Sequence, residues 1–150
     1  MHGRYARRVK KLVLTAFLAI ALLAPLQAQA FQLKLFHTPD GNIGCAMIFG
    51  KDSQGGGARC DIARHSWTAP PKPKWCDVDY GGGLNVGPHR KAEFVCAGDT
   101  TLHQGKVLPV GQVQKLGPYR CKAVSSRMVR CLNRDTGHGF RLSPHLARLF

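Results

Sequence analysis

The chain has 150 residues, and 22 lysines and arginines against 8 acidic residues give it a formal net charge of +14. This length fits a single domain with a modest core. The positive charge predicts anionic neighbours, or else it serves only solubility. Aromatic residues make up 8% of the chain, too few for a platform that stacks single-stranded nucleic acid, so nucleic acid is not an expected partner.

Residues 1–30 have the organisation of a secretory signal peptide. Basic residues precede an apolar run over 12–26, and Ala28-Gln29-Ala30 then provides the small-x-small pattern that a signal peptidase reads. The run is shorter than the roughly twenty residues that a membrane-spanning helix needs. We expect cleavage after Ala30, which leaves a domain of residues 31–150 with no transmembrane segment, exported to the periplasm or the cell exterior.

All six cysteines lie within residues 31–150, and an even number of cysteines in an exported chain predicts disulfides. The absence of any Cys-x-x-Cys argues against a thioredoxin-like redox site and a zinc ribbon. Many pairings are compatible with the spacing alone. From the order of the cysteines along the predicted strands, we expect the pairs Cys45–Cys60, Cys76–Cys96 and Cys121–Cys131.

Glycine and proline divide residues 31–150 into short segments with the composition of β-strands. Segment 143–150 is the exception, because Ser143 can cap a helix and Pro144 suits its first turn. The fold class is therefore all-β, or mainly β with a short C-terminal helix, in one small domain of disulfide-linked β-hairpins. Strands are predicted over 31–37, 43–49, 58–63, 91–97, 119–124 and 127–132.

The segment 69–75 contains three prolines and is expected to be extended and stiff. We interpret it as a connector whose Trp75 packs on the core, and we expect Trp67 in the core or at its rim. The alternative is a ligand for a recognition domain that binds polyproline segments.

The predicted hairpin 119–132 contains the clearest functional hint. With a loop at 125–127, Cys121 lies opposite Cys131, within reach of a bridge. The same register places Lys122 opposite Arg130 on the other face, and like charges placed so destabilise a sheet. A bound anion would relieve the repulsion through charge-assisted hydrogen bonds, whereas side chains that splay apart into water would need no ligand. The predicted anion-binding residues are Arg120, Lys122, Arg127 and Arg130.

The positive charge is concentrated in the last third of the chain. Residues 115–150 carry eight basic residues and one acidic residue, a net charge of +7. The expected partner is therefore an anionic envelope polymer, lipid head groups or a protein.

Asp135 and His138 raise the question of a catalytic acid–base pair. A catalytic histidine needs a nucleophile, but the sequence has no Gly-x-Ser-x-Gly and its cysteines are assigned to disulfides. The single Asp-Thr-Gly falls short of the paired carboxylates of an aspartic protease. The stretch 133–139 is rich in residues that tolerate turn geometry, so we predict a turn and assign no catalytic residue.

Metal-binding patterns are also missing from the sequence. The histidines form no His-x-His or His-Glu-x-x-His pattern. Asp77-x-Asp79-x-Gly81 resembles the start of a calcium loop, but Pro88 stands where the bidentate glutamate belongs. Neither a metal nor another cofactor is expected.

Several short motifs occur along the chain in this order: TPDGNIGC (38–45), RCDI (59–62), WCD (75–77), CAGDT (96–100) and GHGF (137–140). Together with the cysteines and the signal peptide, they resemble a family of small exported bacterial proteins of unknown function. The resemblance covers nearly all of residues 31–150. It implies a bacterial exported protein, and it implies no activity, ligand or catalytic residue.

The leading interpretation is an exported, non-enzymatic binding or envelope-associated protein that contacts anionic surfaces or partners. Two alternatives stay open. One is a secreted hydrolase with a site near His138 and Asp135. The other is an inhibitor of another secreted protein, for which disulfide-held loops would be suited.

Overall fold

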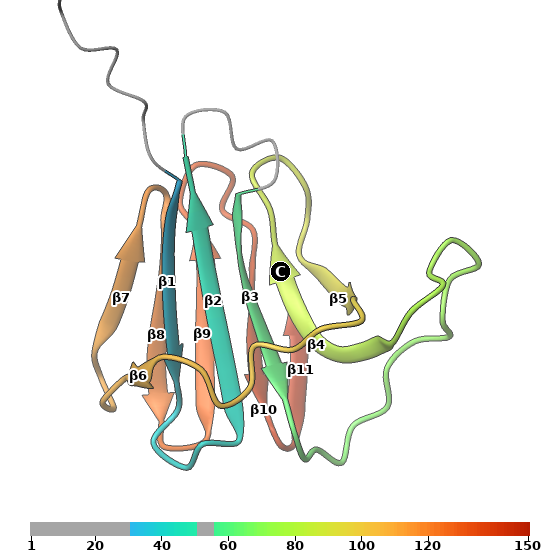
Figure 1. The fold of residues 1–150 in the computed structure, drawn as a ribbon, viewed down its shortest axis with the longest axis horizontal. Helices are drawn as coiled ribbons and strands as arrows, with labels where there is room; N and C mark the ends of the chain where they lie inside the picture. Colours follow the sequence, from blue (N-terminus) through green and yellow to red (C-terminus); the bar gives the residue numbers. More distant parts are fainter. Residues whose placement is uncertain (1–30, 51–55) are drawn as a thin grey trace, which may run out of the picture.

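The computed structural model describes residues 31–50 and 56–150, which form two β-sheets and no helix (Figure 1). The all-β prediction is therefore confirmed, while the predicted signal peptide, 1–30, lies outside the described residues. Sheet A has the strand order β5-β4-β3-β2-β1-β6 and consists of β1 (Gln32–His37), β2 (Ile43–Phe49), β3 (Gly57–Ile62), β4 (Tyr80–Val86), β5 (Glu93–Cys96) and β6 (Lys106–Val107). Sheet B has the order β11-β10-β9-β8-β7 and consists of β7 (Val113–Leu116), β8 (Tyr119–Ser125), β9 (Met128–Asn133), β10 (Gly139–Ser143) and β11 (Leu146–Leu149).

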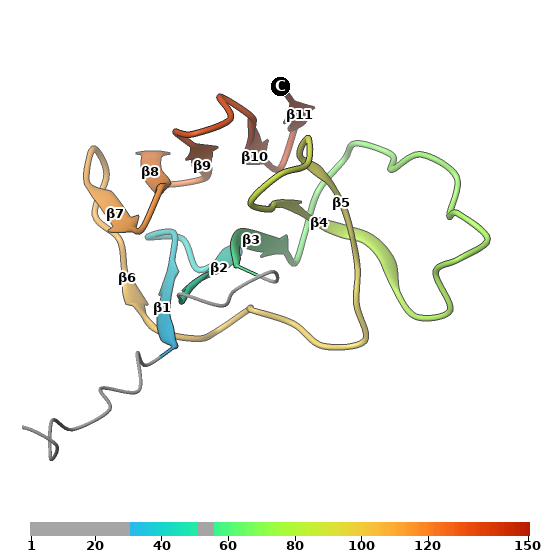
Figure 2. The ribbon, with the colours of Figure 1, turned by 90° about the horizontal axis from the view of Figure 1, so that it is seen from above.

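The two sheets face each other as the layers of a sandwich (Figure 2). Side chains alternate along each strand, so one set points into the space between the layers and the other points outward. In β8, Tyr119, Cys121 and Ala123 are buried while Lys122 and Val124 are exposed. The connection from β5 to β6 crosses the outer face of sheet A, on the side away from sheet B (Figures 1 and 2).

All three predicted disulfides are present: Cys45–Cys60, Cys76–Cys96 and Cys121–Cys131. The first joins β2 to β3 and the third joins β8 to β9, in both cases between residues that lie directly opposite each other. Sγ of Cys60 lies 3.7 Å from Sγ of Cys131. The bridge of sheet A therefore contacts the bridge of sheet B inside the core.

The hairpin of β8 and β9 has the predicted register. Cys121 faces Cys131 and Lys122 faces Arg130. The pairing shifts by one residue next to the turn, where Val124 lies in an irregularity between the paired positions. Such a bulge leaves the faces of the preceding residues unchanged.

The predicted C-terminal helix is wrong, because Leu146–Leu149 form strand β11, which pairs with β10. The hydroxyl of Ser143 accepts a hydrogen bond from the backbone N–H of His145 at 3.4 Å. The residue that was expected to cap a helix thus stabilises the turn between two strands, and the pairing with β10 outweighs the local helix signal.

The predicted packing of Trp75 on the core is also wrong, because its side chain is 68% exposed. Trp75 is a central residue of a turn that the N–H of Cys76 closes by donating to the carbonyl of Pro73 at 3.0 Å. Cys76 is buried beside its disulfide partner, and the indole that precedes it stays outside. Trp67 is partly buried against the core, as predicted.

Removing the sulfurs of the Cys45–Cys60 bridge should destabilise the protein more than removing those of Cys76–Cys96. The bridges span 15 and 20 residues, so loop closure contributes about 3 kcal/mol to each. Only the first bridge packs against another bridge in the core, so Cys45→Ala/Cys60→Ala should cost roughly 1–3 kcal/mol more than Cys76→Ala/Cys96→Ala. Urea unfolding of the two double variants measures the difference, and equal losses would contradict a packing role.

Candidate functional site

Four basic side chains stand in one row across the outer face of sheet B. Lys122 on β8 lies opposite Arg130 on β9. Arg141 on β10 lies opposite both Arg130 and Arg148, the latter on β11. Neighbouring strands are about 4.8 Å apart, so the four backbone positions span about 15 Å. We call Lys122, Arg130, Arg141 and Arg148 the cationic row.

Carboxylates do not neutralise the cationic row within the part of the chain that the structure describes. The five strands of sheet B contain no aspartate or glutamate. The ion pairs between described residues join Arg59 to Asp61 and Asp99, and Arg127 to Asp40. Among the described residues, therefore, no acidic side chain of these strands compensates the like charges of the row.

Arg130 is the member of the row that has a buried donor without a hydrogen bond among the described residues. Its guanidinium carbon lies 5.1 Å from the centre of the Phe150 ring, a cation–π contact. Its Nε is enclosed and has no hydrogen-bond partner among the described residues. Arg130, Arg141, Arg148 and Phe150 line a hollow of about 150 Å³. An acceptor in this hollow would find guanidinium groups from three adjacent strands.

The structure divides the four residues that were predicted to bind an anion. Lys122 and Arg130 belong to the cationic row. Arg120 uses Nη1 to donate to the carbonyls of Gly117 at 2.6 Å and Tyr119 at 2.7 Å. Nε of Arg127 lies 3.7 Å from a carboxylate oxygen of Asp40.

Arg141 and Arg148 were missed as members of the site. Arg148 lies in the segment for which a helix was predicted, so its sheet neighbours could not be inferred. Arg141 lies in β10, which was not predicted as a strand. The available signal for them was the basic composition of residues 115–150.

The stretch 133–139 forms the predicted turn between β9 and β10. The amide oxygen of Asn133 accepts a hydrogen bond from the N–H of Asp135 at 3.0 Å. The N–H of Asn133 donates to the carbonyl of His138 at 2.9 Å, and Thr136 accepts from the N–H of His138 at 3.3 Å. These bonds explain Asp135 and His138 as members of a turn.

A serine–histidine contact lies at the turn between β10 and β11. Oγ of Ser66 is 3.0 Å from Nδ1 of His145 and 3.2 Å from the carbonyl of Pro144. Nucleophilic catalysis by such a pair requires a third group that orients the imidazole. No carboxylate among the described residues is hydrogen-bonded or ion-paired to His145, so the contact is assigned to holding the segment 63–79 against this turn.

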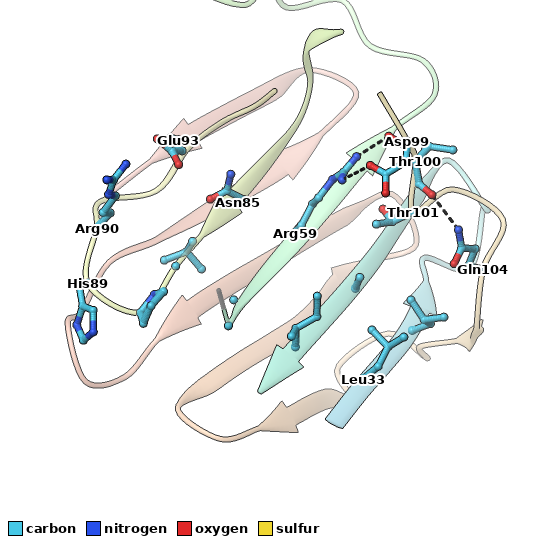
Figure 3. A pocket seen from close by; sticks show the side chains of 18 residues that line it. Leu33, Arg59, Asn85, His89, Arg90, Glu93, Asp99, Thr100, Thr101 and Gln104 are labelled. Atoms are coloured by element: carbon cyan, nitrogen blue, oxygen red, sulfur yellow. Dashed lines mark hydrogen bonds and ion pairs between the residues drawn. The ribbon is translucent and has the colours of Figure 1, made fainter. Parts of the chain in front are cut away.

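A groove of about 620 Å³ occupies the outer face of sheet A (Figure 3). Its apolar floor comes from Leu33 and Leu35 of β1 and from Ala46 and Ile48 of β2. The alternation in β1 predicted the strand correctly, but these leucines point outward, and Phe36 is the β1 residue that is buried in the core. Sheet A therefore presents a hydrophobic surface outside the sandwich.

The opposite end of the groove is polar. Asn85 of β4 lies directly opposite Glu93 of β5, and His89 and Arg90 lie beyond them on the connecting loop (Figure 3). The volume is within the range of small-ligand sites, which combine apolar walls with a few polar groups. The groove can thus enclose the apolar part of a small molecule and offer an amide and a carboxylate to its polar part.

Arg59 organises the wall between these two ends. It donates to Asp61 from Nε at 2.9 Å and from Nη2 at 2.8 Å. It also donates to Asp99 from Nη1 at 2.7 Å (Figure 3). Asp61 also accepts from the N–H of Thr101 at 2.8 Å, whose hydroxyl donates to the carbonyl of Gly44 at 2.6 Å. This network fastens the segment 97–105 across sheet A.

Asp99 makes the attachment of this wall sensitive to pH. The hydrogen bond from Arg59, assisted by its positive charge, holds the pKa of Asp99 below the ordinary value of 3.8. Because the pKa is lower in the folded state, the stabilisation is fully present above that ordinary value and is lost as the pH falls through the folded-state pKa.

Asp99→Asn should remove this dependence. The variant should be less stable than the wild type at about pH 6, and the difference should shrink below about pH 4 because protonation removes the same charge from the wild type. The free energy of unfolding in urea, measured for both proteins across this range, provides the comparison. A difference that stays constant with pH would contradict the role given to the ion pair.

Within the described ranges, no group of three or more histidine, cysteine, aspartate or glutamate side chains is placed to hold a metal ion. No helix of these residues is long and apolar enough to cross a membrane. The three disulfides indicate an oxidising compartment.

No curated protein and no solved structure matches the chain significantly. The sequence model of a family of unknown function, DUF6636, matches residues 16–150. This range contains every described strand and all six cysteines. It confirms the resemblance to a family of unknown function that the short motifs indicated. The chain therefore belongs to DUF6636.

Proposed function

We propose that the protein is a non-enzymatic binding protein whose cationic row holds the anionic groups of an envelope polymer or of lipid head groups. The observation that carries the proposal is the register of sheet B, which aligns Lys122, Arg130, Arg141 and Arg148 on four adjacent strands. The hydrophobic core and the disulfides do not require basic residues at these outward positions.

The energetics of the row support a ligand. Like charges directly opposite each other cost roughly 0.2–1 kcal/mol per pair in a sheet, and the row contains three such pairs. A phosphate, sulfate or carboxylate group between neighbouring arginines would convert this repulsion into charge-assisted hydrogen bonds. Arginine is suited to the task because its planar guanidinium binds such groups in a bidentate manner.

The extent of the row favours a partner with many charges. A single small anion could contact two adjacent side chains, whereas the row spans about 15 Å. Val124 and Phe150 are exposed beside it, at 42% and 36%, so the face combines positive charge with apolar contacts. This combination suits an extended polymer or a layer of head groups better than an isolated ion.

Arg130→Gln/Arg141→Gln/Arg148→Gln should weaken binding to vesicles that contain phosphatidylglycerol and to soluble polyphosphate. Each charge near an anionic surface contributes about 1 kcal/mol, so the loss should be roughly 100-fold. Vesicle co-sedimentation measures binding to the lipid, and calorimetric titration measures binding to polyphosphate. Comparison of the two affinities distinguishes a lipid ligand from a polymer. Wild-type binding should also weaken steeply with salt, because the screening length falls from about 10 Å at 0.1 M to about 3 Å at 1 M.

The matched control is Lys34→Gln/Lys91→Gln/Lys106→Gln, which removes the same number of charges from exposed positions outside sheet B. It should retain most of the affinity. If both triple variants lose affinity equally, binding depends on net charge and not on the row. If neither probe binds the wild type at low salt, the proposed function is wrong.

Arg141→Gln should have opposite effects on stability and binding. Arg141 faces a like charge on each side, so its removal should raise the free energy of unfolding by roughly 0.2–1 kcal/mol while it weakens binding. Urea unfolding at low ionic strength tests the first effect. An unchanged stability would indicate that the side chains splay apart into water and that the row stores no repulsion.

A further inference from the structure

The segment 63–79, which connects β3 to β4, is long for a loop without strands or helices of its own. Loops longer than about 12–15 residues are uncommon in compact domains and usually carry a function. This segment projects sideways from the sandwich beyond the edge formed by β4 and β5 (Figures 1 and 2). It therefore lies apart from the cationic row, which is on the outer face of sheet B.

Both ends of the segment are fixed to the body of the protein. At the first end, the side chain of Asn42 donates to the carbonyl of Arg64 at 2.9 Å and accepts from its N–H at 3.0 Å. Nε1 of Trp67 donates to the carbonyl of Ser143 at 2.9 Å. At the second end, the disulfide joins Cys76 to Cys96. The segment is thus held to both sheets.

The stretch 70–76, near the second end of the segment, is also restrained. Its three prolines fix the backbone angle φ at about −65°, and the hydrogen bond from Cys76 to Pro73 closes the turn that contains Lys74 and Trp75. The next residue after Trp75 is the cysteine of the disulfide. A preformed turn loses little conformational entropy when it binds a partner.

Trp75 is the most exposed large hydrophobic side chain in the described residues, at 68%, and Val78 nearby in the sequence is 45% exposed. Tryptophan is the residue most enriched among those that dominate the energy of protein interfaces. Lys72 and Lys74 are exposed and form no ion pair with a described residue. The turn thus presents an apolar anchor beside unpaired positive charge.

We propose that the segment 63–79 is a preformed recognition loop that inserts Trp75 into an apolar pocket of a protein partner in the same oxidising compartment. The rim of that pocket carries acidic groups that pair with Lys72 and Lys74. Asp77 and Asp79 follow Trp75 closely in the sequence and are exposed as well, so the loop carries both signs of charge. A protein rim can place acidic groups beside the lysines and none beside the aspartates, whereas a uniformly anionic lipid surface repels the aspartates. This proposal goes beyond the anion-binding function and does not depend on it.

Site-specific photo-crosslinking tests the proposal. A benzoylphenylalanine placed at position 75 in the full chain, in the cells that produce it, should give a defined protein adduct on illumination. The same group at position 110, where Val110 is 55% exposed on another loop, should not give that adduct. Mass spectrometry identifies the partner, which is then purified for binding measurements with the unlabelled protein.

Binding of the purified partner provides the quantitative outcome. Trp75→Ala should weaken it by about 30-fold or more, Lys72→Ala/Lys74→Ala should weaken it less, and Val110→Ala should leave it unchanged. Because Trp75 is exposed, its replacement should not alter unfolding in urea. The proposal is overturned if position 75 gives no adduct of its own, or if Trp75→Ala binds within twofold of the wild type.

Two further measurements separate the alternatives. Binding to vesicles of phosphatidylglycerol and phosphatidylethanolamine that is lost in Trp75→Ala would assign the loop to a lipid surface and overturn the proposal. Backbone ¹⁵N relaxation at Lys74 and Trp75 should match that of the strands. Fast motion typical of a free peptide would refute the preformed turn. Loss of vesicle binding in Arg130→Gln/Arg141→Gln/Arg148→Gln but not in Trp75→Ala would support the proposed function of the cationic row. It would also show that the loop is not the lipid-binding element, as this proposal expects.

Discussion

The contact between Cys60 and Cys131, at 3.7 Å between sulfurs, is the constraint on which the arrangement of both faces depends. Each sulfur belongs to a bridge between directly opposed residues of adjacent strands. In a β-strand, a shift of one residue moves every side chain to the other face. With Cys121 and Cys131 held inward, Lys122 and Arg130 must point outward and face each other. The opposition of Lys122 and Arg130 on sheet B thus follows from the pairing of sulfurs inside the core.

Much of the fold could be predicted from the sequence, because the two strands of a hairpin lie close together in the chain. The three disulfides, the register of β8 and β9, and the turn at 133–139 each depend on residues close together in the chain. The position of Trp75 could not be inferred, because it depends on a turn that the hydrogen bond from Cys76 to Pro73 closes. The C-terminal strand was misread because Ser143 and Pro144 carry the same local signal at a helix start and in a tight turn.

The candidate site was predicted only in part, because only two of its residues lie on one hairpin. Lys122 and Arg130 share one hairpin, so their opposition followed from its loop. Arg141 and Arg148 join them only through the pairing of β9 with β10 and of β10 with β11. The groove on sheet A could not be foreseen at all. It depends on Leu33 and Leu35 pointing away from the core, and an alternating strand does not reveal which of its faces is buried.

The disulfides also have a consequence for how the protein forms. Their partners are consecutive in the chain, with no bridge enclosing or crossing another. A polypeptide that enters an oxidising compartment from its N-terminal side can join each cysteine to the next one that emerges. Oxidation in order of arrival gives the native connectivity directly. Maturation of this fold therefore has no inherent need for an enzyme that reshuffles mispaired thiols.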